Sequence, residues 1–433
     1  MLQTIRNAWK IADLRKKLLF TFFFLLLFRL GNVIPVPYVN TRTLTTLFRE
    51  QLQDSIFGLF NMMSGSAFSR GTLFDLSIQP YINASIIIQL LTIAIPYLER
   101  LSKEGGEEGR KKIEKYTRAG TVVLGILTGW AYWKMLQNFD VQFDNALLIP
   151  GRLAAPTIIL SFTAGSTLVM WLGEQITEHG IGNGISMILF ANIVSRAPQM
   201  VISMGNKLMS NFRGYWYVAL IMLAGMVALI MFIVFITNSE RRIPIQYAKR
   251  VVGRKVYGGQ NTFLPIKVNM SGVLPIIFAQ SVATLPATIA MFVGKANDTN
   301  WWYKHVWSNS SVVYQIAYLI LIIGFAYFYA SIQYNPVEIS NNLRKNGGFI
   351  PGYRPGRPTS EFIKRVINKI TLFGAIFLGI VAILPNIAGM ISSDFSEFAL
   401  GGTSVIIVVA VALETVQAIE AQMLMRHYKG FLE

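Results

Sequence analysis

WYVALIMLAGMVALIMFIVFIT, residues 216–237, is an apolar stretch that is followed within five residues by Arg241 and Arg242. About 20 apolar residues in a helix cross the hydrocarbon core of a bilayer, so this stretch predicts a transmembrane helix with a basic end. The same combination recurs along the chain. It predicts ten transmembrane helices, over residues 18–35, 77–95, 119–137, 155–174, 183–202, 216–237, 272–293, 312–333, 370–389 and 401–423.

Basic residues crowd into every second connection between these helices. Of the 39 Lys and Arg residues, 28 lie in residues 6–17, 100–118, 241–267 and 344–369 or after residue 425. Lys and Arg are enriched in the cytoplasmic loops of membrane proteins. The crowded side is therefore expected to be cytoplasmic, with both termini on it.

The composition also indicates a membrane protein. The 433-residue chain is 53% hydrophobic, 14% charged, and has a mean hydropathy of +0.46, which fits poorly with a soluble enzyme. The net charge of +17 lies in connections, so the cytoplasmic surplus explains it better than nucleic-acid binding; a large partner with an acidic or RNA surface stays open. The chain has no cysteine and thus no disulfide or thiolate metal site.

Five of the predicted helices precede the polar stretch near residues 206–214 and five follow it. This division predicts an N-terminal half, residues 1–210, and a C-terminal half, residues 211–433. Because the second half would enter the membrane from the opposite side, an inverted repeat is predicted. The expected fold class is an all-α integral membrane protein.

The connection between the first two helices, residues 41–76, is apolar enough to enter a membrane but too short to cross it. Its apolar part is followed by Gly65, Ser66, Gly71 and Thr72 and contains Ile56, Phe57, Leu59, Phe60, Met62 and Met63. The pattern fits a re-entrant or plugging segment and, equally well, an amphipathic helix on the outer surface.

Two long basic connections, residues 238–271 and 334–369, are punctuated by Pro and Gly. Such connections are ordered protrusions or flexible tethers. Basic ordered protrusions usually contact a partner.

Groups that could perform catalysis do not converge. The three histidines, His179, His305 and His427, lie in or beside connections, without an HExxH motif or a Ser-His-Asp spacing, and there is no GxxxxGK[ST] loop for ATP. We therefore predict that the chain is not an enzyme and has no cofactor. Any work that it does draws energy from a partner, an ion gradient or the substrate.

A few charged residues lie within or beside the predicted helices. Glu174, Glu178 and Glu420 are expected to be hydrated carboxylates at the membrane surface. For Glu414, deeper in the last helix, and for Arg29, in the outer part of the first, a functional role and a structural one are equally favoured.

Branched residues follow one another at helical spacing. Ile82 and Ile86 lie one turn apart, as do Leu189 and Ile193, so each pair lines one helix face. Packing or lipid contact is the usual role of such pairs. A ring of them can instead form a constriction that seals by dewetting, and periodicity does not choose between these roles.

Several long motifs resemble the SecY family, the central subunits of the bacterial Sec protein-conducting channel. The resemblance runs from the N-terminal segment to RHYKGFL near the end. Its motifs are RRIPIQYAKR at 241–250, GRKVYGGQNTFLPIKVNMSGVLPIIFA at 253–279, NNLRKNGGFIPGYRPG at 341–356, MWLGEQITEHGIGNGIS at 170–186 and GGTSVIIVVAVALETV at 401–416.

The resemblance implies ten helices in two halves around an hourglass pore, with a lateral gate that opens to lipid. It favours the re-entrant interpretation of residues 41–76, with a plug at about 56–74. The implied pore ring is Ile82, Ile86, Leu189, Ile193, Ile277 and Ile407. The implied lateral gate, between the second and seventh helices, contains Asn83, Ser85, Gln89, Gln280, Ser281 and Thr284.

The same resemblance implies a function and partners. The chain is expected to translocate unfolded preproteins across the bacterial cytoplasmic membrane and to release membrane segments laterally into lipid, after binding signal peptides. Small membrane subunits resembling SecE and SecG, the SecA ATPase and a translating ribosome are the expected partners. The docking residues for the motor and the ribosome are Lys249, Arg250, Arg254, Lys255, Arg354 and Arg357.

A secondary transporter of a small solute is the main alternative. Inverted repeats and a site at the middle of the membrane would fit ten helices, and Arg29 and Glu414 are its only serious candidates for coupling. An enzyme acting within the membrane ranks third, because no nucleophile and base converge.

Overall fold

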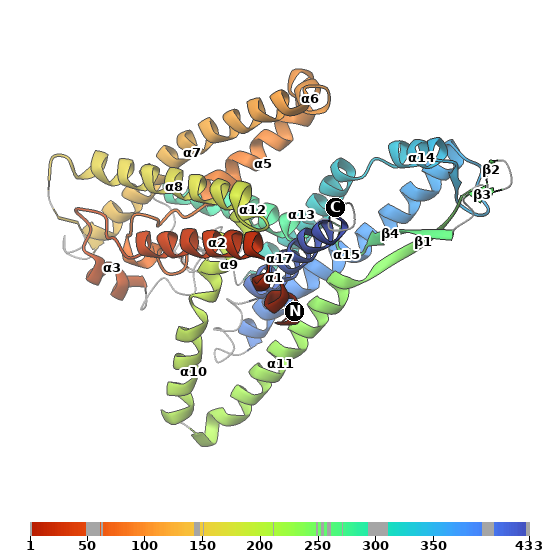
Figure 1. Cartoon of the computed structure of the whole chain (residues 1–433). Helices are drawn as coiled ribbons and strands as arrows, with labels where there is room; N and C mark the ends of the chain where they lie inside the picture. Colours follow the sequence, from red (N-terminus) through yellow and green to blue (C-terminus); the bar gives the residue numbers. More distant parts are fainter. Residues whose placement is uncertain are drawn as a thin grey trace.

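The computed structural model is dominated by helices (Figure 1). It describes residues 2–48, 61, 64–142, 148–149, 151–210, 212–247, 250–252, 255–257, 261–270, 272–292, 311–391 and 402–429. The first part of the chain forms α1 (Leu2–Lys10), α2 (Ala12–Gly31), α3 (Thr41–Leu47), the 3₁₀ helix η2 (Phe68–Arg70), α5 (Gln79–Ala94), α6 (Pro96–Lys103), α7 (Gly106–Gln142), α8 (Ala154–His179), α9 (Gly184–Val194) and α10 (Ala197–Ser210).

The second part adds helices and short strands. The helices are α11 (Phe212–Asn238), α12 (Leu274–Phe292), α13 (Val312–Gln333), α14 (Pro336–Lys345), α15 (Arg357–Ile391) and α17 (Gly402–Lys429). The strands are β1 (Glu240–Tyr247), β2 (Arg250–Val252), β3 (Lys255–Tyr257), β4 (Asn261–Lys267) and β5 (Gly348–Phe349).

Each predicted membrane span coincides with helical structure. Within the described ranges, five helices are long and apolar enough to cross a membrane, and the bent pair α5 and α6 would make a sixth. These five are α8 and segments of α11 (216–238), α13 with α14 (312–345), α15 (357–384) and α17 (404–424). The other predicted spans fall on α2, α7, α9 with α10, and α12. The chain is thus a multi-pass membrane protein.

Helix ends differ from the predicted ones where propensity or proline decides. α7 and α15 begin 13 residues before their predicted spans, at Gly106 and Arg357, because Lys, Arg and Glu continue a helix outside the apolar region. α5 ends at Ala94 and meets the following helix at an angle of 105°. Pro96 has no N–H to donate, which accounts for the bend. The predicted span 183–202 is likewise broken, with Pro198 in the first turn of α10.

The described residues of the two basic connections form strands and a helix, which favours protrusions over tethers. β1 pairs antiparallel with β4 from Glu240↔Lys267 to Gln246↔Asn261, and β5 pairs with the end of β1, which gives the order β4-β1-β5. β2 and β3 form a separate two-stranded sheet (Figure 1). We call β1 to β5, α14 and the chain from β5 to Arg357 the basic projection. Its strands are an addition to the expected all-α architecture.

The basic projection has its own apolar core. Buried side chains from β1, β4, the chain before α15 and α15 itself meet there: Ile243, Ile266, Met270, Ile350, Ile363 and Ile367. This core ties both connections to one helix. The basic projection therefore packs on the N-terminal part of α15, which reaches beyond the other helices (Figure 1).

The helices pack in two groups that meet along a seam. α5, α7, α8 and α9 contact one another, as do α12, α13, α15 and α17. Between the groups, α12 contacts α5 and α7, and α17 contacts α9. The largest apolar core lies across this seam.

Candidate functional site

The six branched residues of the predicted pore ring meet in the large apolar core. Ile82 and Ile86 come from α5, Leu189 and Ile193 from α9, Ile277 from α12 and Ile407 from α17. Five of them are at most 5% exposed, and Ile193 is partly buried against the same core. The four helices come from both sides of the seam. We call these six residues the central ring.

Polar side chains line the contact between α5 and α12. Nε2 of Gln79 donates to Oγ of Ser281 over 3.3 Å, which joins the two helices. Ser281 belongs to the predicted gate, whereas Gln79 was missed. The sequence carries a signal for it, since Gln79 lies one turn before Asn83 on the same helix face.

The other predicted gate residues lie on the same two helices. Gln280 and Thr284 are 4% exposed, and the Thr284 hydroxyl donates within α12 to the Ser281 carbonyl over 2.9 Å. Asn83, Ser85 and Gln89 are partly buried. Oε1 of Gln89 is buried without a hydrogen-bond partner among the described residues. The hydrogen bond from Gln79 to Ser281 thus connects α5 with α12 among the described residues.

The residues predicted for the plug, Ile56, Phe57, Leu59, Phe60, Met62 and Met63, lie outside the described residues. The segment that follows, residues 64–78, is described, and we call it the plug root. Tyr132 on α7 donates to the Phe68 carbonyl over 2.8 Å, and the Phe74 ring stacks on Phe28 of α2 at 5.7 Å. Phe74 and Ile78 belong to the apolar core around the central ring. The plug root therefore packs inside the bundle.

The plug root also pairs with the chain that leaves α2. The Val36 amide donates to the Gly71 carbonyl over 2.9 Å, and the Leu73 amide donates to the Ile34 carbonyl over 2.8 Å. Asp75 lies between these bonds and α5 and is 2% exposed. Burial raises the pKa of the Asp75 carboxyl well above its ordinary value of 3.8. A hydrogen bond from Tyr132 would lower this pKa, but the Tyr132 hydroxyl donates to the Phe68 carbonyl over 2.8 Å, so burial is the larger effect on the Asp75 carboxyl.

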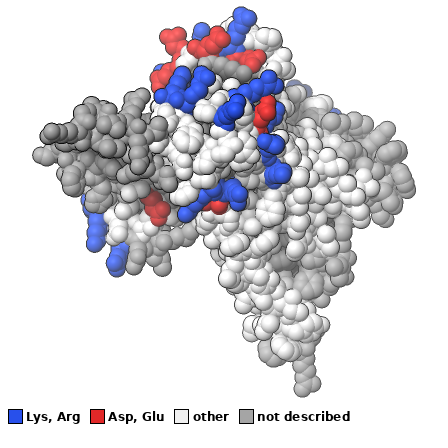
Figure 2. Space-filling view, turned by 90° about the vertical axis from the view of Figure 1, so that its right-hand side faces the viewer, with Lys and Arg blue, Asp and Glu red and all other residues white. Residues whose placement is uncertain are grey.

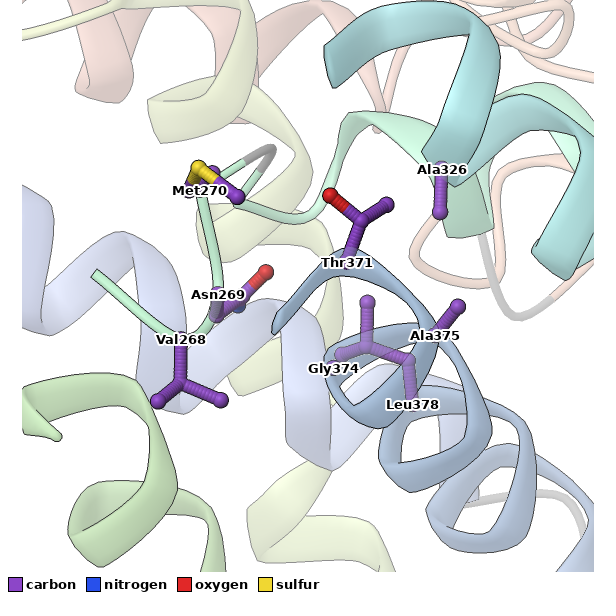
Figure 3. A pocket seen from close by; sticks show the side chains of 8 residues that line it. All are labelled: Val268, Asn269, Met270, Ala326, Thr371, Gly374, Ala375 and Leu378. Atoms are coloured by element: carbon purple, nitrogen blue, oxygen red, sulfur yellow. The ribbon is translucent and has the colours of Figure 1, made fainter. Parts of the chain in front are cut away.

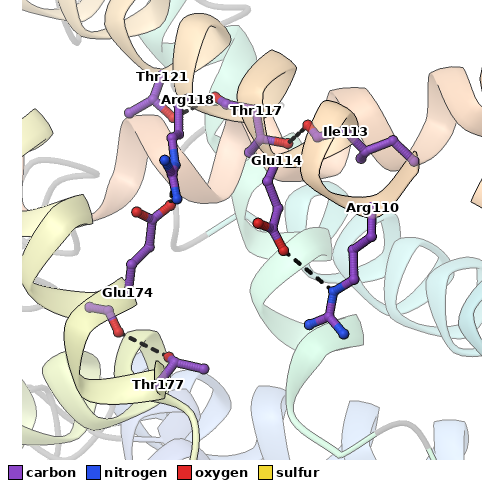
Figure 4. A network of polar contacts seen from close by, with 9 residues as sticks. Arg110, Ile113, Glu114, Thr117, Arg118, Thr121, Glu174 and Thr177 are labelled. Carbon is purple, nitrogen blue, oxygen red and sulfur yellow. Dashed lines mark hydrogen bonds and ion pairs between the residues drawn. The ribbon is translucent and has the colours of Figure 1, made fainter. Parts of the chain in front are cut away.

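The carboxylates near the helix ends have charged or polar neighbours. Glu174 accepts from Nε of Arg118 over 3.0 Å across α8 and α7, beside an Arg110–Glu114 pair at 3.3 Å on α7 (Figure 4). Glu420 accepts from the Thr4 hydroxyl over 3.1 Å. Glu178 is exposed. These contacts fit the expected surface carboxylates. In the described part of the chain, no three His, Asp or Glu residues could hold a metal ion.

The two charged residues with open roles have different surroundings. Glu414 on α17 faces Gly272, where a Cβ would lie 2.7 Å from Oε1. One turn further along α17, Oε1 of Gln417 accepts a hydrogen bond from Nζ of Lys267 over 2.9 Å. Nη1 of Arg29 is buried without a hydrogen-bond partner among the described residues, and it lies beside Gly65 of the plug root. Glu414 therefore lies beside the start of α12, and Arg29 lies beside the plug root.

Two of the predicted docking residues have described side chains. Arg354 and Arg357 are exposed in the basic projection, and Arg357 pairs with Glu361 over 2.9 Å. Arg250 and Lys255 lie on β2 and β3, whereas Lys249 and Arg254 lie outside the described residues. Figure 2 shows Lys and Arg side chains, together with Asp and Glu, over the upper and middle parts of one face, whereas the lowest part of that face is white or grey. Charge is thus sorted along this face.

A small cavity lies where the basic projection joins α12 (Figure 3). Its volume is about 10 Å³, too small for a solute. Nδ2 of Asn269 and Oγ1 of Thr371 border it and have no hydrogen-bond partner among the described residues. The remaining lining residues are Val268, Met270, Ala326, Gly374, Ala375 and Leu378.

Comparisons with known proteins agree on one family. The SecY family model matches residues 72–416. The chain is 41% identical to the protein translocase subunits SecY of Streptomyces galbus and Thermotoga maritima, over all of this chain and 100% and 98% of theirs. A solved protein-conducting channel matches with a TM-score of 0.67 and 19% identity over 94% of this chain and 92% of that chain. Sec61 in the canine ribosome–channel complex matches with a TM-score of 0.64, 18% identity and the same coverage. On its sequence the chain belongs to the SecY family of protein translocase subunits.

Proposed function

We infer that this chain is the protein-conducting subunit of a translocase, through which polypeptides cross a membrane. The family relationship over the full length supports this function. The observation that carries it best is that six branched side chains from four helices, on both sides of the seam, converge in one apolar core. A carrier for a polar solute would instead need polar groups at that point.

The central ring is our candidate for the constriction of the passage. Branched apolar side chains exclude water and ions when no polypeptide is present, because a narrow apolar pore dewets. They also make no strong polar contact with a passing chain. A seal of this kind accepts polypeptides of different sequence.

The contact between α5 and α12 is our candidate for the lateral gate. Hydrogen bonds between helices in a membrane contribute about 1 kcal/mol each, so a seam that rests on Gln79–Ser281 and a few other polar side chains can reopen. An apolar signal helix would replace these contacts with its own while it faces lipid. The plug, at about residues 56–74, would leave the passage at the same time.

The basic projection is our candidate docking surface. The canine Sec61 relative is part of a ribosome–channel complex, and Lys249, Arg250, Arg254 and Lys255 lie in the part of the projection that we assign to a ribosome. Arg354 and Arg357 are assigned to a SecA-like motor. Small subunits like SecE and SecG would hold the two halves, residues 1–210 and 211–433, together. Both termini and the projection would be cytoplasmic, in a bacterial inner membrane, by the charge sorting.

Single cysteines test the passage, because the chain has none of its own. Cysteines at Ile82, Ile86, Ile277 and Ile407 should each crosslink to the same segment of a secretory chain stalled in reconstituted vesicles. A cysteine at Leu223, which is 63% exposed on α11, is the control and should not. Absence of crosslinks at all four ring positions, with protection of the cysteines by small solutes, would favour the secondary transporter instead.

A further inference from the structure

A chain of buried hydrogen bonds joins three segments beside the central ring. Nδ2 of Asn32, at the end of α2, donates to Oδ1 of Asn192 on α9 over 3.2 Å. Nδ2 of Asn192 donates in turn to Oγ of Ser77 in the plug root over 3.0 Å. Asn32, Asn192 and Ser77 are 5%, 0% and 4% exposed. We call these three residues the amide node.

The start of the plug root, at Gly65, also lies against Asn192 of the amide node. Gly65 has a φ of +66°, and a Cβ there would lie 2.9 Å from Oδ1 of Asn192 and 3.1 Å from Nη1 of Arg29. Such an approach and such a backbone angle both suit glycine. Asn192 therefore contacts the plug root at residue 65 and again at residue 77, so that one side chain holds both ends of the segment.

The position of Asn192 on α9 connects the plug root to the passage. Leu189 and Ile193 of the central ring lie on the same helix, three residues before Asn192 and directly after it. A buried amide that loses its partners pays the cost of its removal from water. If the plug root moved away, Nδ2 of Asn192 would lose its bond to Oγ of Ser77 beside the central ring. The node thus opposes displacement of the plug root.

We propose that Asn192 is a positioning residue that holds the plug root in the closed passage, and that the passage opens only when the bond from Asn192 to Ser77 breaks. The proposal rests on the channel function proposed above. It adds a polar closing contact, carried by α9, to the apolar seal of the central ring. On α9, the apolar side chains of Leu189 and Ile193 would then seal the passage, and the polar side chain of Asn192 would hold the plug root.

Hydrogen exchange of the complete translocase complex in lipid nanodiscs tests the node without requiring transport. In Asn192→Ala, the amides of residues 65–77 should exchange about tenfold faster than in the unsubstituted protein, as expected for the loss of one buried polar contact. Ser186→Ala is the matched control, since Ser186 is 6% exposed on the same helix but outside the node. It should leave these amides unchanged.

The pair Asn32 and Asn192 supplies a second readout. Asn32→Ala removes only the bond between Asn32 and Asn192. It should accelerate exchange of residues 65–77 less than Asn192→Ala does, because the bond from Asn192 to Ser77 remains. The double variant should exchange no faster than Asn192→Ala alone, which is the non-additivity expected of residues in one network. Should Asn192→Ala fail to fold, Asn32→Ala still tests the node.

Ion leak through the resting complex then separates the two proposals. Faster exchange together with a raised leak supports a closing role for Asn192. Unchanged exchange at residues 65–77 refutes the node whatever the transport activity, and faster exchange without a raised leak refutes its part in closing. If no preprotein crosses even with the unsubstituted protein, the channel function fails while the exchange result still stands.

Discussion

Ile407 is the residue of the central ring at which the proposed seal can be tested by one substitution. It is 3% exposed on α17 and packs in the core that contains the central ring. Asparagine at this position would bring an amide without partners into an apolar site, at a cost of about 1 to 3 kcal/mol to the closed state. We therefore expect Ile407→Asn to wet the constriction and to relax the requirement for an intact signal sequence.

The measurement is the export of a preprotein with a defective signal sequence, together with the ion conductance of the resting channel. Ile407→Leu keeps an apolar side chain of similar volume and should behave like the unsubstituted protein. An unchanged signal-sequence requirement in Ile407→Asn would remove Ile407 from the proposed ring.

Asp75 should make stability depend on pH. Burial raises the pKa of this carboxyl in the folded protein above its ordinary value of 3.8, so the folded state binds a proton that the unfolded chain releases. Its contribution to stability is thus fully present below about pH 4 and is lost as pH rises toward the folded pKa. Asp75→Asn cannot ionise and should remove this fall.

Thermal unfolding of the detergent-solubilised complex between pH 4 and pH 8 measures the effect. Glu178→Gln, at an exposed carboxylate on α8, is the control and should keep the pH profile of the unsubstituted protein. Identical profiles for Asp75→Asn and the unsubstituted protein would mean that the Asp75 carboxylate is charged in the folded state.

Among the elements, the junction between β4 and α12 can be tested directly, and it links the basic projection to the helix that we propose as one side of the lateral gate. Residues 268–270 cross α15 beside the small cavity, and a Cβ on Gly374 would lie 2.6 Å from the Val268 carbonyl oxygen (Figure 3). That distance is too short for carbon against oxygen. Gly374→Ala should therefore displace the junction and destabilise the fold by about 1 to 3 kcal/mol.

Gly324→Ala is the matched control, since Gly324 lies in α13 and its added Cβ would meet nothing within 4 Å. Alanine should be neutral or slightly stabilising there, because it is the better helix former. The measurement is the midpoint of thermal unfolding of the two variants. Equal midpoints would show that the junction yields without cost.

For the whole molecule, the sorting of charge predicts how docking responds to salt. Contacts of Lys and Arg with RNA phosphates weaken as salt rises, because bound counterions are released on association. Arg250→Ala with Lys255→Ala should lower ribosome affinity and reduce the slope of log affinity against log salt by about one per lost contact. Vesicles that contain the complex can be titrated with ribosomes at several salt concentrations.

Arg110→Ala is the control, at an exposed residue on α7 that pairs with Glu114 outside the basic projection. It should leave both affinity and slope unchanged. A slope that is the same in all three proteins would exclude these two strand residues from phosphate contact.

The local sequence pattern was sufficient to predict the helices that cross the membrane. The apolar stretch at 216–237 had to become a helix, because backbone groups in lipid must bond within their own segment, and α11 covers it. The strands of the basic projection were not predicted, although the alternation of buried Ile243 and Ile245 in β1 is a signal for them. Outside the membrane, water allows several backbone structures, and tertiary packing selects one.

What the amino-acid sequence determined by itself is therefore the membrane-spanning architecture and, through the motifs, its family. Only the tertiary structure decided which side chains meet where no motif links them. Ile82 and Ile407 were grouped through the family resemblance and lie in one core, whereas no local pattern or motif links Asn192 to Asn32 and Ser77. Helical period depends on neighbours within a few residues, whereas convergence of helices depends on how whole faces fit, and that is a property of the folded chain.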